Sequence, residues 1–435
     1  MTMSNNATMP TRNDKQITKQ IVQQQLRKQP DVDKEQPSVE LYCSEYRDQR
    51  CVPHSNNAKS YVFNGDQLFF EGYPYSIELS QTNCEGLEFE KCRFFEAHEG
   101  TLLRVFNING KWYTSTNRRL DAFNSKWAAK TTTFGIHFAD AVRENIRAVN
   151  DDEFFEDEED KKLEERKQDA RGYLNEIYEA SLDKGKKYMF LLEPCKEERI
   201  VCLTNSPRFF NIGVFDKDNN LSLDEDVMLG GYEVPRPQEL VFEDMRDMLY
   251  ALDNIDFKRI QGFIAIQSDD KHFKILNNQY KYYFGLRNNT SSIRFRYLQL
   301  EHQNTMINLG LGVNQQTTSQ TKQMLNDFCA MYDFNPQPVL EYIWMRIVGD
   351  LFQKYQQRYI RKMPDTSLTE KQDTMLKEIH RHFIESLRAG NRRPTDKTRI
   401  MDILSMQKPT TLNQLIAEYE KKDKDAERER LTREM

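Results

Sequence analysis

The sequence predicts an α+β fold, in which an antiparallel-sheet domain is followed by an all-α C-terminal domain. Three observations lead to this prediction. Short aromatic and β-branched runs, separated by Gly, Asn and Asp, are concentrated before residue 300 and are typical of antiparallel strands. Apolar residues at helical spacing dominate after that point. The chain has 435 residues, which is enough for more than one domain.

Composition and charge runs divide the chain into four parts. Residues 1–38 are polar and rich in Gln, Asn and Lys, and they predict a disordered tail. Residues 39–299 form the sheet domain, interrupted by an acidic insertion at 150–168. Residues 300–420 form the helical domain, and residues 421–435 form a charged tail that is either a frayed helix or disordered.

The charge and cysteine content limit the classes of function. Lys and Arg total 62 and Asp and Glu total 68, so the net charge is −6, which argues against coating nucleic acid by bulk electrostatics. A local basic groove remains compatible with this value. No apolar run approaches the ~20 residues of a membrane span, so no membrane partner is expected. The cysteine count is odd, 7, and the cysteines are scattered, which favours a reducing, cytoplasmic location.

Residues 61–118 predict an antiparallel sheet. Aromatic runs at 61–63, 68–70 and 73–75 are separated by turn residues. The strands Thr101–Phe106 and Lys111–Thr116 are joined by a short loop that ends in Asn-Gly, a pair that tolerates positive φ and so predicts a hairpin.

The remaining elements follow from periodicity. Residues 161–182 and 237–253 predict helices, the second from apolar residues at helical spacing. In the helical domain, an apolar stripe runs from Leu340 to Phe352, and Ser367-Leu-Thr-Glu370 reads as a capping box before another helix. Further strands are expected at 187–192 and 199–204, and a second hairpin at 262–266 and 272–276.

Two charged features suggest partners. The acidic run 151–160 is interpreted as a solvated loop, with a docking patch for a basic protein partner as the alternative. Basic residues at 118–130 and 271–296, the second group interleaved with aromatic residues, suit single-stranded RNA or a nucleotide. The alternative is that these aromatic residues belong to the core and the cations are solvated.

No self-contained catalytic signature, such as a Walker A loop or HExxH, is present. Five segments nevertheless occur in a characteristic order, at 94–103, 111–119, 188–201, 260–266 and 272–276. Their order and spacing resemble the covalent nucleotidyltransferase superfamily, most closely phage-type ATP-dependent RNA ligases and the ligase-like proteins of large DNA viruses. The resemblance covers roughly residues 60–290 and, more loosely, the helical domain.

The resemblance implies ATP and Mg²⁺ as cofactors, RNA or nucleotide as partner, and a viral protein of the cytoplasm, viral factory or virion. It also implies a lysine nucleophile three residues before Gly100, but Ala97 stands there, and a methyl group cannot form a phosphoramidate. His98 is expected to face the other side of the strand. Gln261 stands at a motif glutamate, whereas Lys274 is retained.

The sequence therefore predicts a catalytically degenerate RNA-ligase-like protein that binds RNA or nucleotide or serves as an assembly component. No catalytic residue and no resident metal site is assigned. Two alternatives stay open: an active ATP-dependent RNA ligase with a displaced nucleophile, Lys274 or Lys91, and a structural or virion interaction protein. The candidate nucleotide-binding residues are His98, Glu99, Gly100, Arg118, Arg119, Glu193, Gly262 and Lys274.

Overall fold

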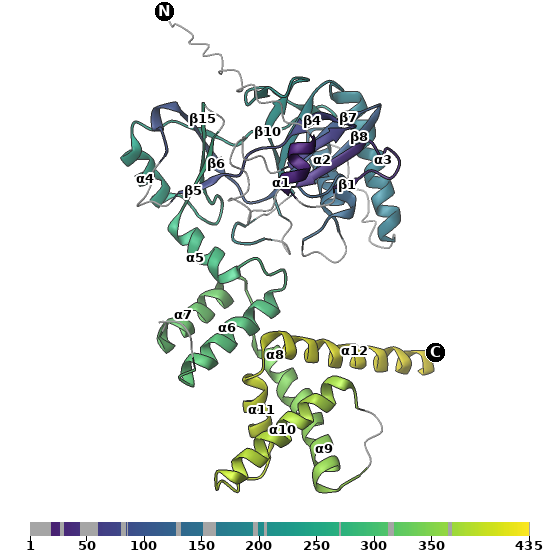
Figure 1. Cartoon of the computed structure of the whole chain (residues 1–435), viewed down its shortest axis with the longest axis vertical. Helices are drawn as coiled ribbons and strands as arrows, with labels where there is room; N and C mark the ends of the chain where they lie inside the picture. The colour runs from purple at the N-terminus through teal and green to yellow at the C-terminus, as the bar shows by residue number, and fades with distance from the viewer. Residues whose placement is uncertain are drawn as a thin grey trace, which may run out of the picture. The chain divides into compact units, whose positions relative to one another are not determined.

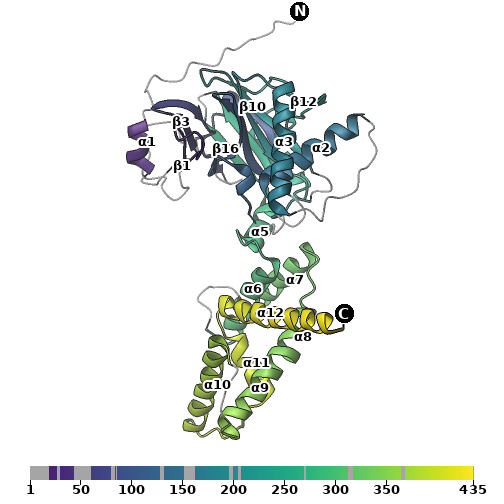
Figure 2. The same ribbon diagram turned by 90° about the vertical axis from the view of Figure 1, so that its right-hand side faces the viewer.

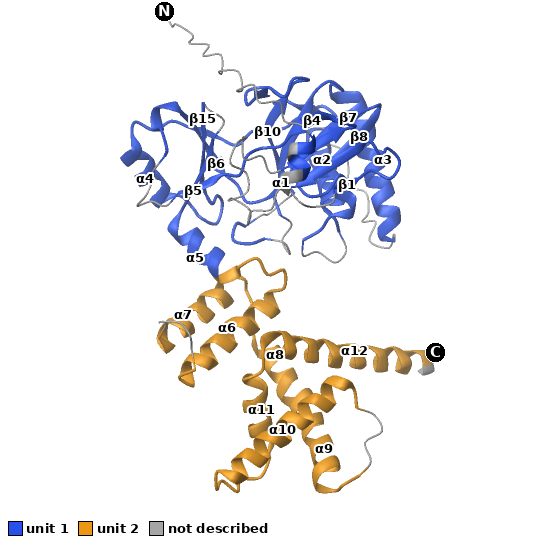
Figure 3. Ribbon diagram, in the orientation of Figure 1, with its two compact units in different colours: residues 1–285 blue, residues 286–435 orange. Residues whose placement is uncertain are grey.

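A computed structural model of the chain shows two compact units, residues 1–285 and 286–435 (Figure 3). The division comes earlier than the expected boundary at residue 299, because α6 (Ile293–Asn308) packs against α7 (Thr318–Met331) in the helical unit. The structure describes residues 19–26, 30–43, 60–79, 84, 86–127, 132–150, 162–194, 199–203, 207–268, 271–311, 317–363 and 368–434.

The first sheet lies at the N-terminal end of unit 1 and has the order β1-β2-β3-β4. The predicted disorder of residues 1–38 does not hold where this region is described. Helix α1 (Lys19–Leu26) buries Val22 against Tyr42, Tyr61 and Phe63 of the sheet. The strands are β1 (Asp31–Val32), β2 (Val39–Cys43), β3 (Ser60–Asn64) and β4 (Gln67–Glu71).

The second sheet has the order β11-β10-β9-β7-β8. Its β7–β8 hairpin confirms the prediction, with Asn109 at φ 53° and Gly110 at φ 83° in the turn. Helices α2 (Phe134–Asn150) and α3 (Leu163–Ser181) cover one face of the sheet and share its core (Figures 1 and 2). The strands are β7 (Thr101–Ile108), β8 (Lys111–Thr116), β9 (Lys187–Leu192), β10 (Phe209–Phe215) and β11 (Leu221–Ser222).

The third sheet has the order β14-β6-β15-β16-β5 and contains the second predicted hairpin, β15–β16. Helix α4 (Met245–Asn254) packs Met248 and Leu252 against Phe94 and Phe263 of this sheet. The strands are β5 (Ile77–Leu79), β6 (Cys92–Ala97), β14 (Glu239–Leu240), β15 (Gly262–Gln267) and β16 (His272–Leu276). A separate short hairpin joins β12 (Met228–Leu229) to β13 (Tyr232–Glu233), and α5 (Asn278–Arg287) follows β16.

Three predictions in unit 1 are corrected. Residues 61–118 do not form one sheet, because their strands are shared among three sheets. The helix expected at 237–253 begins only at Met245, because residues 239–240 pair with β6 as β14. Residues 199–203 form no strand, because backbone N–H groups of this segment donate to the Glu99 carboxylate instead.

Unit 2 is helical, as predicted. After α6 and α7 come α8 (Gln337–Tyr342), α9 (Gly349–Tyr355), α10 (Glu370–Arg388), α11 (Lys397–Ser405) and α12 (Pro409–Glu434), with π-helical segments at Ile343–Val348 and Gln356–Ile360. The capping box of α10 is formed by Thr369 and Gln372, whereas the expected box began at Ser367, which lies outside the described residues. The charged tail continues α12 as far as Glu434.

The acidic run 151–160 lies outside the described residues, and α3 begins at Leu163, inside the expected insertion at 150–168. Within the described ranges, no helix is both long enough and apolar enough to cross a membrane.

Candidate functional site

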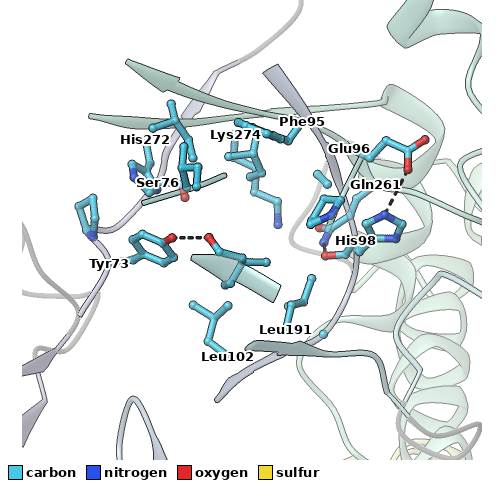
Figure 4. A pocket seen from close by; sticks show the side chains of 18 of the residues that line it. Tyr73, Ser76, Phe95, Glu96, His98, Leu102, Leu191, Gln261, His272 and Lys274 are labelled. Carbon is cyan, nitrogen blue, oxygen red and sulfur yellow. Dashed lines mark hydrogen bonds and ion pairs between the residues drawn. The ribbon is translucent and has the colours of Figure 1, made fainter. Parts of the chain in front are cut away.

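A pocket of about 560 Å³ lies between the second and third sheets of unit 1. Its walls are largely apolar, and its ionisable side chains stand among aromatic and aliphatic ones (Figure 4). The lining residues are Tyr73, Pro74, Tyr75, Ser76, Glu78, Phe95, Glu96, Ala97, His98, Gly100, Leu102, Leu191, Asn211, Ile212, Leu223, Arg236, Pro237, Gln261, Ile264, Ile266, His272, Lys274 and Phe284.

The pairing of β6 with β15 positions residue 97, where the resemblance implies a lysine nucleophile. Ala97 is the last residue of β6, and it pairs with Gly262 at the start of β15. The Gln261 N–H donates to the Ala97 carbonyl at 2.8 Å. The Ala97 methyl group lines the pocket, so this position offers neither an amine nor a hydroxyl group.

Gly100 and Gly262 permit close approach between strands. A Cβ atom at residue 100 would lie 2.3 Å from the Leu192 carbonyl oxygen, and one at residue 262 would lie 2.1 Å from the Ile275 carbonyl oxygen. Any side chain would therefore collide with backbone atoms. Gly100 also lines the pocket, whereas Gly262 does not. Packing alone accounts for both of these motif glycines.

Lys274 projects from the middle of β16 into the pocket (Figure 4). Its ammonium group makes no hydrogen bond or ion pair with any residue of the described ranges, although Glu78 and Glu99 act on it over a longer range. Burial lowers the pKa of Lys274 below the ordinary value of 10.5, and these carboxylates oppose the shift. The pocket thus contains a half-buried amine that no described residue bonds.

His98 lies between two carboxylates at the pocket wall. Its Nε2 is 3.3 Å from Glu96 Oε2 (Figure 4), and its Nδ1 is 3.3 Å from Glu193 Oε1. The ring stacks on Phe210 with the ring centroids 4.3 Å apart. Burial alone lowers the pKa of His98, but Glu193 and Glu96 outweigh it and raise the pKa above 6.5.

The expectation that His98 faces away from Ala97 is wrong, because both residues line the pocket. Side chains alternate between the two faces only within a strand, and β6 ends at Ala97. The backbone from His98 to Gly100 is irregular, so alternation does not extend to His98.

Glu99 and Glu193 are engaged inside the protein and do not line the pocket. The Glu99 carboxylate accepts hydrogen bonds from the N–H groups of Ile200, Val201 and Cys202, and burial raises its pKa. The Glu193 carboxylate is held by Arg208, with Nη2 at 2.8 Å and Nε at 3.0 Å. Both carboxylates are therefore hydrogen-bonded to groups of the protein.

Gln261, which stands at the glutamate position of the motif, has a structural role as a hydrogen-bond donor. Its side-chain amide donates a hydrogen bond to the backbone carbonyl of His98. A carboxylate at this position would have no hydrogen to donate. The amide thus fixes the irregular segment after β6 against the start of β15.

Arg118 and Arg119 are not brought to the pocket. They are exposed, they follow β8, and Arg119 Nη1 lies 3.3 Å from Asp31 Oδ1. The sequence reasoning missed Tyr73, Arg236 and His272 as lining residues. The aromatic run at 73–75 predicts only a strand, and no local pattern distinguishes Arg236.

The residues present do not fit the Mg²⁺ ion that the resemblance implies. Among the residues that the structure describes, no group of three or more His, Cys, Asp or Glu side chains is arranged to hold a metal. The two pocket-lining carboxylates already have partners: Glu96 contacts His98, and Glu78 Oε1 lies 3.3 Å from Lys281 Nζ. Mg²⁺ depends on available carboxylate oxygens.

Sequence comparison relates the chain to viral proteins. Over 258 residues, covering 58% of this chain, it is 29% identical to the immediate-early protein ICP-46 of Frog virus 3, and it spans 62% of that protein, less than two thirds of its length. It is 25% identical over 386 residues to the ICP-46 homolog of Invertebrate iridescent virus 6, covering 85% of this chain and 77% of the relative. These relatives agree with the expected viral source. No family model matches the chain.

Solved structures give a weaker likeness. A protein of Aquifex aeolicus assigned as an ATP-dependent DNA ligase aligns with a TM-score of 0.35 and 12% identity, over 78% of this chain and 79% of that one. An archaeal ATP-dependent RNA ligase aligns with a TM-score of 0.34 and 9% identity, over 76% and 75%. At these values the likeness does not bear on the activity of this chain.

Proposed function

We propose that this chain is an RNA-ligase-like protein that binds a nucleotide noncovalently in the pocket of unit 1 and forms no covalent nucleotide adduct at residue 97. One observation carries the proposal. Lys274 presents an ammonium group that no described residue pairs with, inside a largely apolar pocket on whose wall Ala97 presents only a methyl group.

The chemistry of the pocket suits a nucleotide. A volume of about 560 Å³ lies within the usual range for small-molecule sites. An ammonium group binds phosphate oxygens through charge-assisted hydrogen bonds. Aromatic and aliphatic side chains such as Phe95 and Ile264 offer flat, apolar contact surface to a base. The pocket would thus bind both the phosphate and the aromatic base of a nucleotide in one cavity.

Covalent nucleotidyl transfer of the kind that the resemblance implies uses a lysine amine, and the positions of the two candidate lysines differ. Lys91 is exposed, lies outside the pocket lining, and is 2.6 Å from Glu88. Lys274 lines the pocket on β16 and has a lowered pKa. If covalent chemistry occurred with a displaced nucleophile, Lys274 would therefore be the residue to carry it.

Thermal unfolding tests the binding. Purified full-length chain is heated with AMP, ATP or GTP, with and without MgCl₂. A ligand that binds only the folded state raises Tm, and at a concentration of 100 Kd it adds about 2.7 kcal/mol. We expect an increase for wild type and for the exposed control Lys217→Met, which lies outside the pocket lining, and little or none for Lys274→Met. Unchanged Tm for wild type with all of these ligands would contradict the proposal.

Denaturing gels test the absence of covalent transfer. Wild-type chain is incubated with α-labelled ATP or GTP and divalent cation, and no labelled band is expected. A band that disappears in Lys274→Met would instead establish a displaced nucleophile. Ala97→Lys, with Gln261 unchanged, is the companion variant. A gain of label in this variant would support the correspondence between residue 97 and the nucleophile position.

A further inference from the structure

We infer that the pocket binds its nucleotide without a divalent cation, and that the ligand class is a nucleoside monophosphate. This inference rests on the proposed function and departs from the ATP and Mg²⁺ that the resemblance implies. It follows from the partners of the described carboxylates in and beside the pocket, and from Lys274, which no described residue pairs with.

The carboxylates that line the pocket are already paired. Glu96 Oε2 lies 3.3 Å from His98 Nε2, and Glu78 Oε1 lies 3.3 Å from Lys281 Nζ. A metal ion would have to compete with these side chains for the same oxygens. Lys281 also places a positive charge next to the Glu78 carboxylate, which disfavours a divalent cation there.

The carboxylates behind the pocket wall are engaged more firmly. Glu99 accepts backbone N–H bonds from 200–202, and Glu193 binds Arg208 and contacts His98. Withdrawing Glu99 toward a metal would leave buried N–H groups without partners, at a cost of about 1–3 kcal/mol for each group. Residue 261 is a glutamine, so it offers no carboxylate to a metal, and its side-chain N–H donates to the His98 carbonyl.

The positive charges available to a ligand are few. Lys274 has no hydrogen-bonded or ion-paired partner among the described residues. Arg236 Nη2 lies 3.1 Å from Asp226 Oδ1, and His98 stands between two glutamates. Among the described residues, the pocket therefore offers one ammonium group without a direct hydrogen-bonded or ion-paired partner, on which Glu78 and Glu99 act only over a longer range.

This charge matches a monophosphate better than a triphosphate. A phosphate monoester carries about two negative charges at neutral pH. Each further phosphate adds charge that neither a metal nor a second free cation would neutralise, and uncompensated charge in an apolar site is costly. A nucleoside monophosphate places its phosphate at Lys274 and its base against the apolar walls.

Isothermal titration calorimetry of the full-length chain tests the inference. The ligands are AMP, GMP, CMP, UMP, ATP and GTP, each titrated in EDTA and in MgCl₂. We expect at least one monophosphate to bind with a Kd that changes less than about twofold between the two buffers. We also expect Lys274→Met to weaken that binding about tenfold or more, because a charge-assisted hydrogen bond is lost. Lys217→Met, at an exposed position outside the pocket lining, should bind as wild type does.

The outcomes separate the inference from the proposed function. Binding confined to ATP or GTP in MgCl₂ and abolished by EDTA would overturn the inference and leave the proposed function standing. Monophosphate binding that is equally tight in Lys274→Met, with that variant folded by circular dichroism, would also overturn the inference. The absence of heat and of a Tm increase with all six ligands in both buffers would overturn the proposed function and the inference with it.

Discussion

The side-chain amide of Gln261 donates a hydrogen bond to the backbone carbonyl of His98, and both residues are buried. Gln261→Glu replaces this donor with an acceptor that faces the same carbonyl oxygen. We expect the variant to lose about 1–3 kcal/mol of unfolding free energy at pH 7, measured by urea denaturation. The loss should shrink in acid, because a protonated carboxyl group donates again.

The matched control for this prediction is Gln67→Glu, the same substitution at an exposed position of β4. It should change stability by no more than about 0.5 kcal/mol. Equal urea midpoints for the two variants would show that the amide at residue 261 does not hold the segment after β6.

Gly100→Ala should destabilise the chain by about 2 kcal/mol or more, because the added Cβ would lie 2.3 Å from the Leu192 carbonyl oxygen on β9. Gly172→Ala provides the control. Gly172 lies in α3 with open space around it, so alanine there should stabilise the helix by up to about 1 kcal/mol. Urea unfolding curves of both variants give the comparison, and destabilisation of equal size would argue against the close approach at residue 100.

Lys274→Met should stabilise the ligand-free chain at pH 7 by about 1 kcal/mol, because a thioether is buried more readily than an ammonium group. The sign of the pH dependence follows from the lowered pKa. The unfolded chain binds the Lys274 proton more tightly, so wild-type stability should rise as pH increases through the folded-state pKa toward 10.5. The variant should lack this rise in pH-dependent urea unfolding, and a variant less stable than wild type would contradict the cost assigned to this amine.

His98→Gln should destabilise the chain by about 1 kcal/mol at pH 6 and by less at pH 9. The pKa of His98 is raised in the folded state, so its stabilising contribution is complete below the unfolded pKa of 6.5 and is lost as pH rises through the folded value. NMR titration of the imidazole gives the folded pKa directly. A midpoint below 6.5 would show that burial outweighs the flanking glutamates.

The irregular segment His98–Gly100 shows where sequence reasoning about the site reached its limit. The residues Ala97, Gly100, Gln261 and Lys274 were identified from their order, and all four line one pocket. Their functions were not evident from that order. Alternation along a strand placed His98 on the wrong side, because the point at which β6 ends depends on its pairing with β15.

Local patterns in the sequence determined the division into a sheet-rich and a helical part, the two hairpins β7–β8 and β15–β16, and helix α3. Each of these depends on residues near one another in the chain, through a turn or a periodic apolar face. The sequence also shows directly that residue 97 has no amine and that residue 261 has no carboxylate, because they are Ala and Gln.

The tertiary structure alone decided how residues 61–118 are shared among three sheets and which charges remain available in the pocket. Glu99 and Val201 are 102 positions apart, and Gln261 and His98 are 163 apart. No local periodicity encodes such pairings, because they depend on which strands meet when the core is packed. For the same reason, only the folded chain distinguishes Lys274, which has no bonded partner among the described residues, from Glu99 and Glu193, whose carboxylates are engaged.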